Sequence, residues 1–107
     1  MPQNAIATLD VSEGVNTLIN ITAPVVVKAA PGRVARMFVI SPGTAGALVL
    51  NDTTALPSAA AANEIFYVPY NATNMYAGNT VMNQAPMKSG ITISQVPAGF
   101  QGTLVFN

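Results

Sequence analysis

The sequence contains no cysteine and no histidine, and charged residues make up only 7% of its 107 positions. Without cysteine there is no disulfide framework, and without either residue type there is no Cys/His zinc site. The same absences exclude a Ser-His-Asp triad and a Cys-His dyad, two common arrangements for nucleophilic catalysis. The chemistry open to this chain is therefore narrow.

The few charges are balanced, with four basic and four acidic residues and a formal net charge of zero. A typical soluble domain carries about 25% charged residues. Nucleic-acid affinity comes mainly from Lys and Arg that neutralise phosphates, so nucleic acid is not an expected partner. Low charge also leaves little repulsion between neighbouring copies, which favours a surface that is covered in an assembly. The alternative is a small monomer kept soluble by its many Asn, Thr, Ser and Gln residues.

Long apolar segments are missing as well. No apolar run approaches the roughly 20 residues that span a bilayer as a helix, so no membrane partner is expected. Residues 1–4 carry no basic region and no apolar core follows them, so no secretory signal is expected.

What the chain does contain is a series of short apolar runs, each bounded by Gly, Pro, Asn, Asp or Ser. No stretch holds a 3.6-residue apolar period over three turns. This pattern predicts an all-β fold of about eight short strands, an antiparallel β-sandwich or a jelly-roll-like domain. The expected strands are residues 5–9, 15–21, 25–28, 32–40, 47–50, 64–70, 79–83, 90–96 and 103–106.

Turn residues predict the connections between these strands. Residues 97–99, Pro-Ala-Gly, are expected to join the last two strands as a hairpin, and residues 85–90 are expected to form a loop. The only helix candidate is the alanine run 59–62, a single turn that Ser58 could cap.

Alternation along each strand assigns side chains to its two faces. The side chains expected to point inward include Leu48, Leu50, Ile91, Ile93, Leu104 and Phe106, and those expected outward include Thr92 and Ser94. In the segment 64–70, Ile65 and Tyr67 share one face, and Phe66 and Val68 share the other. In the segment 32–40, one face carries Val34, Arg36, Phe38 and Ile40, and the other carries Arg33, Ala35, Met37 and Val39.

Two regions are expected along the chain. Residues 24–107 form the sandwich domain, and residues 1–23 form either an N-terminal arm that orders against a neighbour or an ordinary edge hairpin. The arm interpretation rests on scattered apolar side chains without the dense β-branched runs seen later in the chain. Such a segment can add strands to the open edge of a neighbouring subunit.

No catalytic pattern is visible among the four carboxylates, Asp10, Glu13, Asp52 and Glu64. Asp52 follows Asn51 after a strand, a typical turn position, and the others fit solvated positions. Nothing in the spacing pairs two of them for acid and base work. We therefore expect a protein that is not an enzyme, with no catalytic residue, no cofactor and no metal.

Several side chains are candidates for a partner interface, because Arg, Met and aromatic residues are enriched at such surfaces. Arg36 lies between apolar neighbours of an otherwise weakly charged strand, and three tyrosines and a methionine fall within ten residues. Solvated strand ends and core positions are the alternatives. The candidate interface residues are Ile6, Leu9, Arg36, Phe66, Tyr67, Tyr70, Met75 and Tyr76.

Residues 27–39, VKAAPGRVARMFV, resemble a recurrent phage pattern in which K-x-x-P/G-G-R-L/V opens a long strand. Residues 43–52, GTAGALVLND, are similar to the G-T-A-G-S-L-T-L-N-D segment of that pattern. Asn63-Glu64-Ile65 then leads to Pro69, and Ser89-Gly90-Ile91 and Pro97-Ala98-Gly99 close the chain. Over residues 24–107 these features resemble small virion proteins of tailed bacteriophages.

This resemblance implies a capsid decoration, or cement, protein on the outer surface of the virion head. Its partners would be the major capsid protein and further copies of itself, with a trimer favoured. It would act by burying surface that stabilises the capsid. The alternative that the resemblance leaves open is a head-fibre or tail-fibre module that binds a host receptor or glycan.

Overall fold

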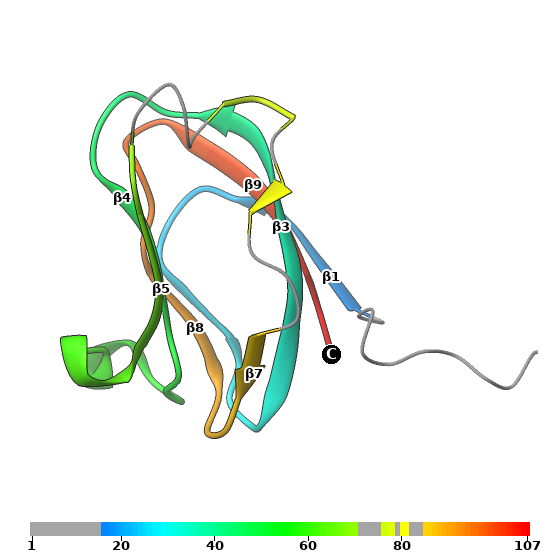
Figure 1. Ribbon diagram of the computed structural model, residues 1–107, viewed down its shortest axis with the longest axis vertical. Helices are drawn as coiled ribbons and strands as arrows, with labels where there is room; N and C mark the ends of the chain where they lie inside the picture. Colours follow the sequence, from blue (N-terminus) through cyan, green and yellow to red (C-terminus); the bar gives the residue numbers. More distant parts are fainter. Residues whose placement is uncertain (1–15, 71–75, 79, 82–84) are drawn as a thin grey trace, which may run out of the picture.

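The computed structural model describes residues 16–70, 76–78, 80–81 and 85–107 as two antiparallel sheets that face each other (Figure 1). One sheet has the strand order β1-β9-β3-β6, with β7 also paired to β3, and the other has the order β2-β8-β4-β5. The strands are β1 (Asn16–Ile21), β2 (Val25–Lys28), β3 (Gly32–Pro42), β4 (Ala47–Asn51), β5 (Glu64–Pro69), β6 (Thr80–Val81), β7 (Ala85–Met87), β8 (Ile91–Gln95) and β9 (Phe100–Phe106). The predicted all-β sandwich is confirmed.

The core lies between the inner faces of the two sheets. Leu48 and Leu50 from β4 and Ile93 from β8 meet Met37 from β3 and Leu104 from β9, and each of these side chains is fully buried. The inward positions predicted for β4 and β8 are therefore confirmed. Burying a side chain of this size contributes about 1.5–3 kcal/mol, so this layer is the main source of stability.

A bulge in β3 changes the faces predicted for that strand. Val34 pairs with Phe106 and Arg36 with Val105, so Ala35 is an extra residue opposite β9. The extra residue breaks the two-residue alternation, and Val34 joins Met37 in the core instead of sharing a face with Phe38. The prediction for Val34 was wrong because alternation alone contains no signal for a bulge.

The predicted hairpin of the last two strands is also wrong. β8 belongs to the four-stranded sheet and β9 to the five-stranded sheet, so residues 97–99 carry the chain from one layer to the other. Ala98 donates its N–H to Ala45 O at 2.8 Å, and Thr44 donates its N–H to Ala98 O at 2.8 Å. These bonds hold the crossing against the loop between β3 and β4, a contact distant in sequence.

One segment that was predicted as a loop contains a short strand. Residues 85–87, expected in a loop, form β7 along residues 32–34 of β3, so part of that loop prediction was wrong. Proline lacks an N–H and is unfavourable within a strand, so the sequence contained no signal for β7. In the structure Pro86 nevertheless lies opposite Arg33 in the pairing of β7 with β3.

The alanine-rich segment forms two 3-10 turns, η3 (Leu56–Ser58) and η4 (Ala61–Asn63). Ser58 does not cap the second turn. Instead Asn63 reaches back, and its Oδ1 accepts the N–H of Ala60 at 3.1 Å while its Nδ2 donates to Ser58 O at 2.9 Å. The side-chain amide of Asn63 thus accepts one bond and donates another across the segment, in place of the predicted serine cap.

Asp52 acts as the turn residue that its sequence position suggested. Its carboxylate accepts the backbone N–H groups of Lys88 at 3.0 Å, Ser89 at 2.7 Å and Gly90 at 3.2 Å. Burial raises the pKa of this carboxyl. The three N–H groups and the Lys88 charge together lower the pKa by more than burial raises it, so the pKa lies below its ordinary value of 3.8. The side chain thus ties the end of β4 to the turn before β8.

The segment predicted as an arm or edge hairpin is described only from residue 16. Residues 16–21 form β1, which pairs with β9 at the edge of the five-stranded sheet, with Asn16 opposite Phe106. The strand expected at residues 5–9, with Ile6 and Leu9, lies outside the described residues. In place of the strand expected at 79–83, the described part contains β6, which pairs with Met37 and Phe38.

Candidate functional site

Two surfaces of the described residues combine exposed apolar side chains with polar groups. The first is the outer surface of the five-stranded sheet, here called the β3/β9 face, formed by Thr17, Arg36, Phe38, Ile40, Thr103 and Val105. The second is a hollow of about 420 Å³ on the outer surface of the four-stranded sheet, here called the sheet hollow. Within the described ranges no three acidic side chains gather as a metal site would require, and no helix is long and apolar enough to cross a membrane.

Strand register builds the β3/β9 face. Val105 lies between Thr17 of β1 and Arg36 of β3, and Thr103 lies opposite Phe38. Their buried neighbours Met37 and Leu104 point the other way, into the core. Ile40 is the extra residue of a second β3 bulge, between the pairs of Val39 and Ser41, and is 53% exposed. The face is therefore made of apolar and hydroxyl side chains around one arginine.

Arg36, a predicted interface residue, lies half-buried on this face. The sequence placed it between Val34 and Phe38, but Val34 is in the core and Val105 is its neighbour instead. Arginine packs its stem on apolar surface while its guanidinium offers several donors in a planar fork. Its place on the face suits contact with another protein.

The aromatic cluster predicted from residues 66–76 is divided by the fold. Phe66 and Tyr70 pack against the core, while Tyr67 points outward from β5 and is 56% exposed. Tyr76 is 49% exposed and lies near the other sheet, because Gly78, two residues later, donates its N–H to Val39 O at 2.7 Å. Met75 lies outside the described residues. Tyr67 and Tyr76 therefore do not form one surface.

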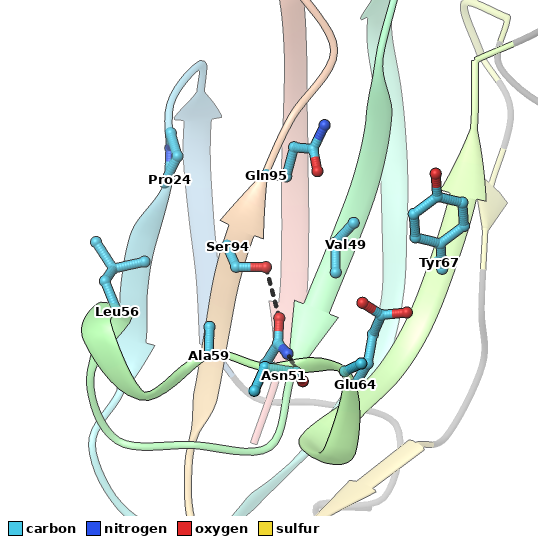
Figure 2. Close-up of a pocket in the computed structure, with 11 residues that line it drawn as sticks. Pro24, Val49, Asn51, Leu56, Ala59, Glu64, Tyr67, Ser94 and Gln95 are labelled. Carbon is cyan, nitrogen blue, oxygen red and sulfur yellow. Dashed lines mark hydrogen bonds between the residues drawn. The ribbon is translucent and has the colours of Figure 1, made fainter.

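The sheet hollow is built on two rows of side chains that cross three strands (Figure 2). In one row Val49 of β4 lies between Tyr67 of β5 and Gln95 of β8. In the next row Asn51 lies between Glu64 and Thr92. The three-residue spacing of Glu64 and Tyr67 would place them on opposite faces of a regular strand, but the register shift at Ile65 puts both on the outer face.

A hydrogen-bond network fixes one wall of the hollow. Asn51, which is 1% exposed, donates from Nδ2 to Ala60 O at 2.9 Å and to Asn63 Oδ1 at 2.8 Å. Its Oδ1 accepts the hydroxyl of Ser94 at 2.5 Å, the bond drawn in Figure 2. The 56–63 segment, which lies outside the four-stranded sheet in Figure 1, is thereby held against β4 and β8.

The floor and rim differ in chemistry. The floor is Val49, only 4% exposed, and Leu56 and Ala59 add apolar surface from the 3-10 turns. Around it Glu64, Tyr67 and Gln95 are exposed and offer a carboxylate, a phenol ring and a primary amide. A concave apolar floor with a few placed polar groups is the usual form of a binding site for a small molecule.

Sequence patterns predicted Tyr67 as an interface residue and Ser94 as an outward residue, but they did not predict the hollow that these two residues share. Its formation depends on register shifts at Ile65 and between Val49 and Leu50, and on the return of residues 56–63 over the sheet. None of these features leaves a periodic signal. No family model, no curated protein and no solved structure matches this chain.

Proposed function

We propose that this chain is a structural protein of a bacteriophage virion that decorates the outer surface of the capsid. It acts without catalysis, by covering surface on the major capsid protein and adding buried contact area that stabilises the shell. The phage context comes from the resemblance of residues 24–107 to small virion proteins. The observation that supports a contact function is the β3/β9 face.

The β3/β9 face has the composition of a protein interface. Phe38, Ile40 and Val105 give it apolar area, and Arg36 is the one charge among the residues that define it. Depletion of charge with retention of arginine and aromatic residues is typical of interface centres. Fully burying one such apolar side chain contributes about 1.5–3 kcal/mol, so a few of them give useful binding at each of the many equivalent capsid positions.

The test is binding to capsids that lack this protein, measured by co-sedimentation. Ile40→Glu places a charge on the β3/β9 face at a side chain that is 53% exposed, and Ile65→Glu is the matched control on the other sheet, at 44% exposure. We expect Ile40→Glu to weaken binding by roughly tenfold or more, and Ile65→Glu to bind as the wild type does. Circular dichroism verifies that both variants are folded. Equal binding by wild type and Ile40→Glu would contradict the proposed face.

Self-assembly is the second part of the proposal. A surface with so little charge favours a homo-oligomer, and a trimer suits a cluster at a threefold position of an icosahedral shell. Analytical ultracentrifugation of the purified chain measures this state directly. A protein that stays monomeric at high concentration and also fails to bind the capsids would refute the proposal as a whole.

A further inference from the structure

The sheet hollow lies on the opposite layer from the β3/β9 face and is not used by the function proposed above. It contains the exposed ring of Tyr67, and Gln95 lies across Val49 from it. Adjacent strands are about 4.8 Å apart, and β4 lies between β5 and β8, so the ring and the amide are two strand spacings, about 9.6 Å, apart above an apolar floor. A single six-membered sugar ring fits in this space.

The polar groups of the hollow select among the possible occupants. No lysine or arginine lines it, and Glu64 places a carboxylate at its edge. A nucleotide or another phosphate ester would therefore meet a negative charge with no cation to offset it. Carboxylate and amide oxygens accept hydrogen bonds from hydroxyl groups, and the amide nitrogen donates to them. The groups present match a neutral molecule with many hydroxyls.

The apolar groups favour a sugar over a simple polyol. One face of a pyranose ring presents C–H groups, which pack on the negative face of an aromatic ring and on aliphatic carbon. Tyr67 provides such a ring and Val49 provides the aliphatic floor, while the ring edge of the sugar remains available to Glu64 and Gln95. The wall opposite is already rigid, because Asn51 and Asn63 hold residues 58–63 in place.

We propose that the sheet hollow binds one pyranose unit of a neutral saccharide, with Tyr67 as the stacking surface and Glu64 and Gln95 as hydrogen-bonding partners. The site adds a carbohydrate contact to a protein whose other face binds the capsid. Saccharide binding can be measured with the isolated protein and without capsids, so its test is separate from that of the decoration function.

The test is a titration of the full isotope-labelled chain with maltotriose, cellotriose and chitotriose, followed by nuclear magnetic resonance. At least one of these saccharides is expected to shift the backbone amide of Tyr67 and the side-chain amide of Gln95 in a saturable way. Tyr67→Ala should weaken that binding by about tenfold, and Tyr67→Phe, which keeps the ring, should change it by less than about threefold. Tyr76→Ala is the matched control, because Tyr76 is similarly exposed (49%) and lies outside the hollow. It should bind as the wild type does.

Three results of the titration would overturn the proposal: no shift with any of the three saccharides at millimolar concentration, shifts that map away from the hollow, or undiminished binding by folded Tyr67→Ala. Loss of capsid co-sedimentation in Tyr67→Ala without saccharide binding by the wild type would also overturn it, and would assign the hollow to a protein contact. Saccharide binding with normal capsid attachment supports both proposals independently.

Discussion

Asn51 offers the sharpest test of how this sandwich is held together. It is a fully buried amide whose two donors and one acceptor are all used, by Ala60 O, Asn63 Oδ1 and the Ser94 hydroxyl. Asn51→Ala removes all three bonds. Asn51→Asp keeps the size and shape of the side chain but replaces the donating nitrogen with an oxygen that faces two acceptors.

The expected cost follows from the number of groups left without partners. A typical hydrogen bond contributes a net 0.5–1.5 kcal/mol, and an orphaned buried group costs about 1–3 kcal/mol. Three lost bonds, partly compensated by water entering from the hollow, give roughly 3 kcal/mol for Asn51→Ala. In a domain of this size that corresponds to a melting temperature lower by roughly 15 °C. Asn51→Asp at neutral pH should cost at least as much, because it also buries a charge.

The two variants are distinguished by pH. Burial and the two facing oxygens raise the pKa of the introduced carboxyl above its unfolded value of about 3.9. The folded state then binds the proton more tightly, so the stability of Asn51→Asp falls as pH rises from about 4 towards the raised pKa. A protonated carboxyl can again donate one hydrogen bond, so part of the loss is recovered at low pH. Asn51→Ala has no such pH dependence of its own.

Urea unfolding followed by far-ultraviolet circular dichroism at several pH values measures both effects. Asn16→Asp is the control, because Asn16 is exposed and its replacement adds the same charge without burial. The difference in unfolding free energy from wild type should depend on pH for Asn51→Asp and not for Asn16→Asp. If Asn51→Asp is as stable as the wild type at pH 7, or gains stability relative to it as pH rises, the network does not hold the 56–63 segment as described.

Two further predictions concern stability. Asp52→Ala removes the acceptor of three backbone N–H groups and should lower the free energy of unfolding by about 2 kcal/mol at pH 7 in denaturant titrations. Because the folded pKa of Asp52 is lowered, the stability that its carboxylate contributes is present above about pH 4 and is lost as pH falls through the folded pKa. The difference in unfolding free energy between wild type and Asp52→Ala should therefore shrink in acid. A difference that does not change with pH would contradict the charge-assisted bonds. Gly102→Ala would place a Cβ atom 2.6 Å from Cζ of the buried Phe100 ring, and we expect a loss of about 1–3 kcal/mol in the same assay, whereas an unchanged midpoint would show that the ring moves without cost.

The local pattern of the sequence was sufficient for the fold class and for much of the core. Leu48 with Leu50, and Ile91 with Ile93, alternate with outward residues in strands without a bulge at those points, so their burial follows from period-two alternation. The pattern failed at Val34, where the extra residue Ala35 reverses the faces. A bulge is stabilised by pairing with another strand and not by the residues around it.

Long-range pairing explains the other failures. A Pro-Ala-Gly turn predicts only that the chain reverses direction, and the same turn can join a hairpin or connect two layers. In this fold the backbone hydrogen bonds of Thr44 and Ala98 stabilise the connection between the layers. The sheet hollow was hidden for the same reason. Tyr67 and Gln95 are brought together by the pairing of β4 with both β5 and β8, which no single segment specifies.

The position of β8 and β9 in their sheets has a consequence for synthesis of the protein. β8 lies between β2 and β4, and β9 lies between β1 and β3, so these two strands, which follow the other described strands along the chain, are inner strands of the two layers (Figure 1). Until residues 91–106 have left the ribosome, β1 and β2 lack their partners, and the described pairs that can form are β3 with β6, β3 with β7 and β4 with β5. Folding of the sandwich therefore waits until residues 91–106 are available, and it proceeds at the slow pace of chains whose contacts are distant in sequence.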